Sequence, residues 1–274
     1  AHARDAMWQA DTAIEAMSCA VASAVGMDRL AEDMMVFASA EFGFVRLSDR
    51  HSRASKIMPQ KRNPFALAYI RGLANRLIGE QAGVAASGRT LTGQMDSRSL
   101  PYVAVPRALG SVSGAASLLA ELLSEMTFDK VRAKSALSNG ACYASDLAER
   151  LCLELRISFR AAHGIVGRLV TQLEEQGRTL SELTAVELKA ACHAHDPAMP
   201  PPTKGLITRA MSPRESLEAR RDIGGAAPML LRQYCSELKE QFRAFGDWSI
   251  DQAAHNQEAE NQLLSEVRVF LEER

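Results

Sequence analysis

Residues 55–64 read Ser-Lys-Ile-Met-Pro-Gln-Lys-Arg-Asn-Pro, which brings a hydroxyl, an amide and several cations together within one short stretch. Pro59 and Pro64 lack backbone N–H donors and bias the residues before them away from helix. The pattern therefore predicts an ordered loop that ends where a helix begins. Side chains on such a loop are free to face a ligand, so this stretch is the first candidate for a functional site.

Positive charge is concentrated around this loop. Residues 46–62 contain six cations and one acid, Asp49, although the formal net charge of the whole chain is only −1. A cluster of this kind predicts a small polyanion as ligand, here a carboxylate. The near-neutral overall balance argues against nucleic acid as a partner. The cations are Arg46, Arg50, Arg53, Lys56, Lys61 and Arg62.

The composition is that of an ordinary globular protein. The chain has 274 residues, of which 47% are hydrophobic and 24% are charged, enough for one large core or two modest ones. Its five cysteines are widely spaced and show no metal-ligand pattern, so neither a disulfide framework nor a metal site is expected. No segment approaches about 18 uninterrupted apolar residues, and the N-terminus does not read as a signal peptide. We therefore expect a cytoplasmic protein without a membrane partner.

Apolar residues recur at helical spacing almost throughout, and aromatic residues make up only 5% of the chain, so the sequence predicts an all-α fold. One helix is expected over residues 5–42. Pro64 is well placed to start a second helix, which runs to about residue 86. A third helix is expected to start at Pro101 or Pro106. Helices of these lengths suit a bundle.

The loop is similar to the signature loop of the fumarase/aspartase superfamily, which reads roughly Gly-Ser-Ser-x-Met-Pro-x-Lys-x-Asn-Pro. The alternative interpretation is a basic turn with an N-capping serine, which the in-register matches make the weaker one. The resemblance implies an active site that acts on a small dicarboxylate. The residues that match in register are Met58, Pro59, Lys61, Asn63 and Pro64.

The resemblance also implies a role for each polar residue of the loop. Ser55 takes the position of the base that removes a proton from the carbon next to a carboxylate. Lys61 and Asn63 would hold that carboxylate as it gains a second negative charge, and donors aimed at developing charge usually make the largest catalytic contribution. A serine base requires nearby cations and loop amides that stabilise the alkoxide. The further substrate-binding candidates are Lys56, Met58 and Gln60.

A second block resembles the C-terminal domain of argininosuccinate lyase. Residues 158–167 are similar to the Pro-Phe-Arg-Glu-Ala-His motif of that family, and residues 216–228 are similar to the region that ends in Gly-Gly-Thr-Ala-Pro. For His163 in this block, a structural role is favoured over a catalytic one. The resemblance implies a long-helix bundle of the fumarase/aspartase type followed by a small helical domain. The expected parts are residues 1–140, the second half of the bundle with the loop at 51–64, then the C-terminal domain at 141–246 and a terminal amphipathic helical extension at 247–274.

Together the two blocks imply that the chain corresponds to the C-terminal half of an argininosuccinate lyase-like subunit. The implied reaction is a β-elimination that cleaves a C–N bond of argininosuccinate or a related N-substituted aspartate, as in arginine biosynthesis. It yields fumarate and an amine, with no cofactor and no metal. Family active sites are assembled in a homotetramer, so the implied partners are further copies or the N-terminal half, which would carry the general acid. A muconate-type cycloisomerase and a non-catalytic chain, either crystallin-like or half of an enzyme, are the alternatives.

Departures from the family pattern bear on the substrate. Ala54 replaces the loop glycine, and Ala68 replaces an acid that orients the active-site histidine of the family. Residues 95–103, Met-Asp-Ser-Arg-Ser-Leu-Pro-Tyr-Val, replace the stretch that binds the arginine part of argininosuccinate. A site seldom keeps its specificity after losing the polar partners of a leaving group. We therefore expect a different amine, and the nearby polar residues either bind it or form a solvated turn: Gln94, Asp96 and Arg98.

Overall fold

The computed structural model describes residues 9–89, 95, 98–138 and 140–272. The chain divides into two compact units, Ala1–Ala136 and Leu137–Arg274. We call them the bundle unit and the second unit. Most described residues are helical, and strands occur only as two-residue pairs, which confirms the all-α fold.

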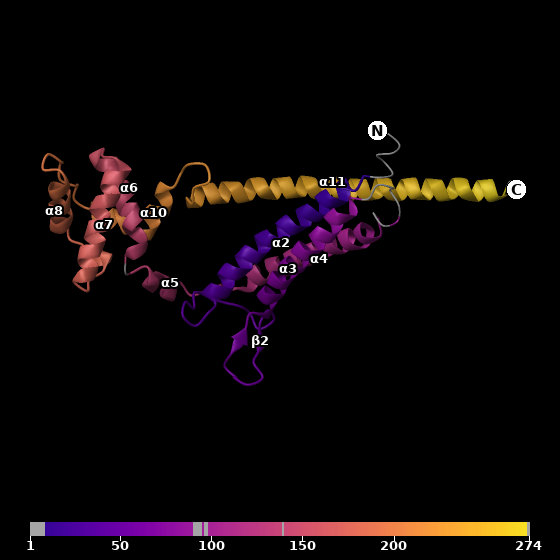
Figure 1. Cartoon of the computed structure of the whole chain (residues 1–274), viewed down its shortest axis with the longest axis horizontal. Coiled ribbons are helices and arrows are strands. Elements are labelled where there is room, and N and C mark those ends of the chain that lie inside the picture. Colours follow the sequence, from indigo (N-terminus) through magenta and orange to yellow (C-terminus); the bar gives the residue numbers. More distant parts are fainter. Residues whose placement is uncertain (1–8, 90–94, 96–97, 139, 273–274) are drawn as a thin grey trace. The chain divides into compact units, whose positions relative to one another are not determined.

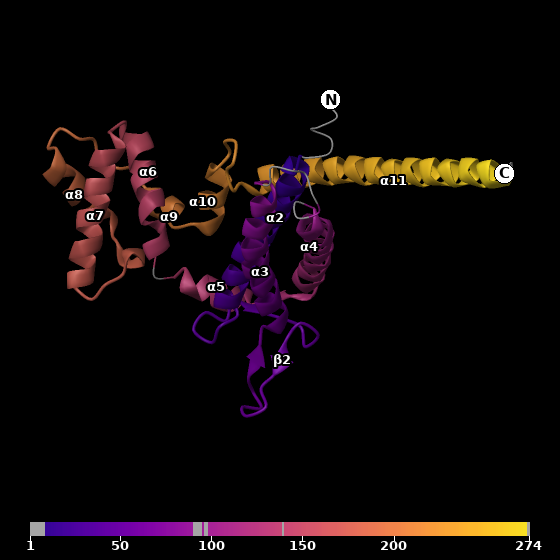
Figure 2. The ribbon, with the colours of Figure 1, turned by 45° about the vertical axis from the view of Figure 1, so that its right-hand side comes forward.

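Three long helices form the bundle unit: α2 (Asp11–Phe37), α3 (Phe65–Ser87) and α4 (Ser99–Glu125). They lie side by side in both views (Figures 1 and 2). Alanines recur at helical spacing on the buried faces of these helices. Because the methyl side chain is small, the backbones of neighbouring helices can approach closely. The fully or almost fully buried residues of this core include Met17, Ala20, Ala24, Leu67, Ile70, Leu77, Ala104, Ala108 and Leu122.

The end of α2 and the start of α4 differ from the expected helix boundaries. α2 ends at Phe37, earlier than expected. The chain then turns back, with Gly43 at a φ of 60° and the Phe44 amide donating to the Phe37 carbonyl at 2.8 Å, and the rings of Phe37, Phe42 and Phe44 pack together. α4 begins at Ser99, so Pro101 lies in its first turn, where a missing N–H breaks no helical hydrogen bond. Pro106 does not start this helix but lies inside it.

α4 is also apolar. By length and mean hydropathy alone it could cross a membrane, the one helix in the described part of the chain that passes this test. Its buried residues, among them Ala115 and Leu119, belong to the core that it shares with α2 and α3. Only 28% of the most apolar window of α4 is buried within the chain, and apolar side chains such as Val103 and Leu109 are exposed.

The bundle unit contains two short strand pairs. Three of the strands lie between α2 and α3, and the fourth follows α4. β1 (Val45–Arg46) pairs antiparallel with β4 (Thr127–Phe128). β2 (Arg53–Ala54) pairs antiparallel with β3 (Arg62–Asn63). Pro64 follows β3 directly and takes the N-cap position of α3, which starts at Phe65, one residue later than the sequence predicted. The bundle unit ends with a short helix, α5 (Lys130–Ala136).

The second unit packs short helices around its own core. Ser158 caps α7 by accepting a hydrogen bond from the Ala161 amide at 3.2 Å. Leu147, Leu151 and Ile165 are fully buried in the core. The helices are α6 (Ala144–Leu155), α7 (Phe159–Glu175), α8 (Ala185–His195), α9 (Leu206–Ala210) and α10 (Pro213–Ala219), with 3-10 turns at Ala141–Tyr143 and Leu180–Glu182.

A capping box fixes the start of α8. Thr184 and Glu187 exchange hydrogen bonds, and the Arg178 guanidinium lies 2.6 Å from the Glu187 carboxylate. These contacts, that of Arg178 first, lower the pKa of Glu187 to about 2. The carboxylate therefore stays ionised as the acceptor that this helix start needs.

The last helix, α11 (Pro228–Glu272), is one continuous element. The expected extension that begins at residue 247 is therefore part of a longer helix. No residue of α11 is buried, and it carries exposed apolar side chains such as Phe245 and Trp248.

Candidate functional site

The predicted loop is the tip of a β-hairpin. β2 and β3 form its stem, which projects from one end of the three-helix bundle (Figure 2). Across the tip, the Ser55 amide donates to the Lys61 carbonyl at 3.1 Å, and the Lys61 amide donates to the Met58 carbonyl at 3.0 Å. The loop is therefore ordered by its own backbone, although the side chains from Lys56 to Arg62 are exposed.

Ser55 is half-buried at this tip, and its hydroxyl oxygen is the centre of a small turn. The oxygen accepts the backbone amides of Ile57 at 3.2 Å and Met58 at 3.1 Å. Two N–H groups aimed at one oxygen would stabilise an alkoxide there. The same two contacts also fit a serine that only closes a turn, so this geometry is compatible with both interpretations of the sequence.

A cavity of about 590 Å³ lies beside the hairpin, walled by the end of α2, by β1 and by one flank of the loop. Met58, Gln60, Lys61 and Asn63 line it. Of the predicted site residues, Ser55 and Lys56 are not among its lining residues. Polar residues that the sequence did not single out as site residues also line the cavity: Arg46, Asp49, Ser52 and Arg62.

The charges in this cavity are not balanced. Arg62 is 3.5 Å from the Asp49 carboxylate and also donates to the Pro59 carbonyl at 3.0 Å. In the described part of the chain, no carboxylate pairs with the side chain of Lys61 or Arg46. Two cations thus remain free to attract an anion, which is the electrostatic character that the sequence predicted.

Beneath the hairpin lies a buried polar group that sequence reasoning missed. The His51 side chain is only 5% exposed, and its Nδ1 lies 2.9 Å from the Ser48 hydroxyl. That hydroxyl donates to Glu125 at the end of α4, at 2.7 Å. The pKa of Glu125 is lowered by the Ser48 hydrogen bond first and by nearby Arg50. No sequence pattern could have found this group, because its partner is far away along the chain.

Other residues singled out in the sequence are more dispersed. Ala68 is exposed on the first turn of α3. Arg98 precedes the first residue of α4, and Tyr102 on that helix is 67% exposed. Gln94 and Asp96 lie outside the described residues. His163 belongs to the second unit, where it is exposed on α7 beside the Phe159 ring.

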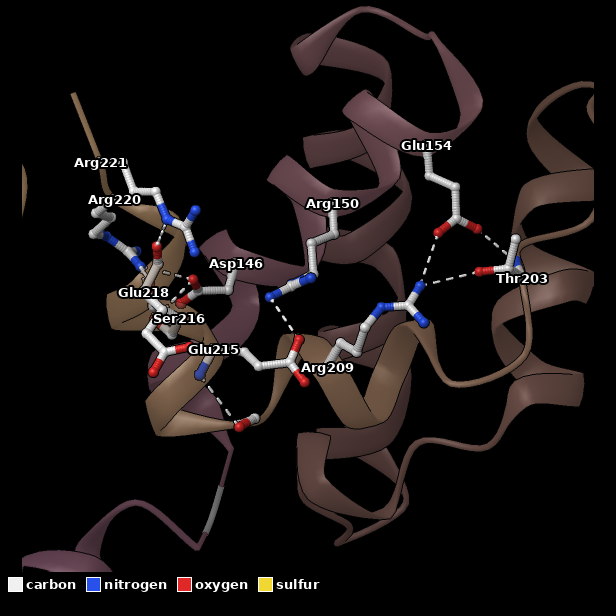
Figure 3. A network of polar contacts seen from close by, with 11 residues as sticks. Asp146, Arg150, Glu154, Thr203, Arg209, Glu215, Ser216, Glu218, Arg220 and Arg221 are labelled. Carbon is white, nitrogen blue, oxygen red and sulfur yellow. Dashed lines mark hydrogen bonds and ion pairs between the residues drawn. The ribbon is translucent and has the colours of Figure 1, made fainter. Parts of the chain in front are cut away.

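The second motif block forms a network that holds α10 on α6 (Figure 3). The buried Asp146 carboxylate accepts hydrogen bonds from the Ser216 hydroxyl at 2.9 Å and from Arg220 at 3.0 Å. A neighbouring cavity of about 530 Å³ contains Arg150, but this cation is paired with Glu215 at 3.3 Å. These contacts give Ser216 and Arg220 of the motif block a structural role.

Comparisons with known proteins cover both parts of the chain. A family model described as lyase matches residues 1–79, and one described as argininosuccinate lyase C-terminal matches residues 141–218. An argininosuccinate lyase from Thermus thermophilus is 34% identical over 239 residues, which is 86% of this chain. The chain spans about half the length of this curated relative, 50%.

Solved structures share the fold. An EDDS lyase variant with bound fumarate superposes with a TM-score of 0.75 at 22% identity, over 87% of this chain and 48% of that one. The 3-carboxy-cis,cis-muconate lactonizing enzyme from Pseudomonas putida superposes with a TM-score of 0.54 at 20% identity, over 76% and 44%. At these identities the likeness concerns the fold alone.

Proposed function

Because the chain belongs to the fumarase/aspartase superfamily and is argininosuccinate lyase-like, we propose that the full-length protein cleaves a C–N bond of an N-substituted aspartate. The products are fumarate and an amine. The observation that carries the proposal is the cavity beside the hairpin, where Lys61 and Asn63 lie together and two cations have no carboxylate partner among the described residues. A dicarboxylate complements that charge.

In the proposed reaction, Ser55 removes a proton from the carbon next to a carboxylate. Lys61 and Asn63 hold this carboxylate while it carries the extra negative charge. The electron pair then forms the carbon–carbon double bond of fumarate as the C–N bond breaks, and the amine leaves with a proton from a general acid. Ser55 acts in this step as its alkoxide and becomes the neutral hydroxyl when it takes the proton. The Ser55 oxygen accepts two backbone amides, which would stabilise the alkoxide before the transfer.

The proposal includes no metal and no organic cofactor, since base and carboxylate clamp are side chains of the protein. We further propose a cytoplasmic homotetramer, or an assembly with the N-terminal half, which would supply the general acid, as the resemblance to the superfamily implies. A muconate-type cycloisomerase is the second candidate. It is favoured by Ala68, which stands where the family has an acid.

We expect the full-length protein to act poorly on argininosuccinate and better on an aspartate with a different N-substituent. The residues that would bind the carboxylates are present. The stretch that binds the arginine part of argininosuccinate in the family is replaced here by residues 95–103. Missing polar contacts can cost a factor of about 10⁴–10⁵ in discrimination, against about 10–200 for small apolar changes. Fumarate formation is followed by its ultraviolet absorbance with argininosuccinate and a panel of N-substituted aspartates.

Each result of the substrate panel tests a different part of the proposal. If argininosuccinate proves the best substrate, the interpretation of residues 95–103 is wrong while the lyase proposal stands. If no compound releases fumarate, the lyase proposal fails. Turnover of a carboxymuconate in a parallel assay would then favour the cycloisomerase.

Replacing Lys61 with methionine should weaken both substrate binding and turnover. The lysine lines the cavity and would lose a charge-assisted hydrogen bond to the carboxylate, which contributes about 1.5–3 kcal/mol. Steady-state kinetics and the Kd of fumarate measure the two effects separately. Lys134→Met is the matched control, because Lys134 is exposed on α5 and does not line this cavity. Equal effects of the two variants would argue against a carboxylate contact by Lys61.

A further inference from the structure

The candidate catalytic hairpin is too small to hold its own position. Its stem consists of two residue pairs, Arg53 with Asn63 and Ala54 with Arg62. An isolated two-stranded ribbon is at best marginally stable in water. The side chains at its tip are mostly exposed and bury no core. Its orientation must therefore come from contacts at its base, where the chain enters and leaves the hairpin.

At that base, the backbone of His51 joins the two ends of the hairpin. Its amide donates to the Ser48 carbonyl at 3.1 Å, which closes a turn on the entering side. Its carbonyl accepts the Ala66 amide at 3.2 Å, in the first turn of α3 on the leaving side. His51 is also the buried polar residue of the bundle unit among the described residues, so its ring needs a hydrogen-bond partner.

The number of protons on Ser48 determines which atom donates in each hydrogen bond of this network. The Ser48 hydroxyl has one proton, and it donates this proton to Glu125 Oε2 at 2.7 Å. Toward His51, 2.9 Å away, the same oxygen can only accept. Nδ1 of His51 therefore carries a hydrogen and donates it to Ser48, and the same nitrogen lies 3.4 Å from Glu125 Oε2. The second oxygen of Glu125 accepts from Arg50 at 2.9 Å, so both carboxylate oxygens are engaged.

We propose that His51 is a positioning residue, which acts through Ser48 and Glu125 to hold the base of the hairpin against the end of α4. The chain is thereby tied to a long helix four residues before Ser55. The hydrogen-bonded ring, the Ala66 contact and the ion pair of Arg50 with Glu125 leave the base little freedom to tilt. The effect on turnover rests on the proposed function, but the effect on the hairpin does not.

The structural arm of the test is hydrogen exchange in the full-length protein. His51→Leu removes the donor, and His51→Asn keeps an N–H near the position of Nδ1. Ser48→Ala removes the bridging hydroxyl with a smaller change and leaves only the longer contact of Nδ1 with Glu125 Oε2, at 3.4 Å. In the leucine and alanine variants we expect the Ser55 and Lys61 amides to exchange about tenfold faster. This factor corresponds to the free energy of one hydrogen bond to a charged group. Core amides of α2 should exchange as in the wild type, and His51→Asn should restore most of the protection.

Unchanged exchange at Ser55 and Lys61 in both Ser48→Ala and His51→Leu would overturn the proposal. Faster exchange throughout α2 and α3 in Ser48→Ala would overturn it as well, since the network would then stabilise the whole bundle. The alanine variant keeps this arm decisive even if His51→Leu does not fold.

The kinetic arm separates positioning from general stabilisation. A misplaced catalytic group can cost about 100-fold in rate, so kcat should fall by about 10–100-fold in His51→Leu, with KM changed less and with rescue by His51→Asn. If the wild type proves inactive while the exchange results hold, the proposed lyase function fails and the positioning role stands. If kcat is unchanged in an active enzyme with a loosened hairpin, the positioning role in the reaction is wrong.

Discussion

Replacing Ser55 with alanine is expected to lower kcat by about 100-fold or more, because a positioned base contributes at least that factor. Fumarate affinity and helical content should remain nearly unchanged. The hydroxyl belongs to a half-buried loop residue, so its loss leaves no cavity in the core. Initial rates of fumarate formation by the full-length protein, together with the Kd of fumarate from calorimetry, measure the two properties.

The fumarate affinity is what distinguishes a lost base from a loosened turn. Ser55 also accepts the amides of Ile57 and Met58, so its removal could loosen the hairpin tip. In that case affinity would fall together with rate. A variant that keeps more than about a tenth of the wild-type rate would remove Ser55 from the role of base. Ser117→Ala removes the same atoms from an exposed site on α4 and should change the rate by no more than about twofold.

Replacing Asp146 with alanine is expected to destabilise the second unit by about 2–4 kcal/mol. Breaking a buried charged pair costs about 3–5 kcal/mol, because the remaining partner is left without compensation. Here Arg220 is 36% exposed and water can partly replace the carboxylate, which lowers the estimate. The buried Ser216 hydroxyl loses its acceptor in addition. Figure 3 shows how the three side chains converge from α6, from α10 and from the residue that follows α10.

Native-state hydrogen exchange of α6 amides at increasing urea concentration measures this loss within the full-length protein. Leu153→Ala is the control on the same helix, since Leu153 is 79% exposed, and it should change the free energy of opening by less than about 0.5 kcal/mol. Asp146→Asn keeps an oxygen acceptor for Ser216 and should lie between the two. A change below about 0.5 kcal/mol for Asp146→Ala would show that the network does not stabilise this unit.

The sequence by itself determined the helical class, the ordered loop and the start of α3. These features depend on properties that act over a few residues. Pro59 and Pro64 restrict the backbone locally, so no distant contact is required. The superfamily was likewise identifiable from short motifs, and the family models confirm it. The roles of Ser55, Lys61 and Asn63 remain predictions.

Only the tertiary structure decided how the loop is held and what surrounds it. Ser48 and Glu125 are 77 residues apart, and β1 pairs with a strand that follows α4. Which residues meet across such distances depends on how three long helices pack, and helical spacing gives each helix a buried face without naming its neighbour. For the same reason, the sequence could not show that Arg46 shares a cavity with Lys61 while Ser55 lies off its wall. Local propensity acts along the chain, whereas the cavity and the buried His51 exist only once segments distant in the sequence have packed together.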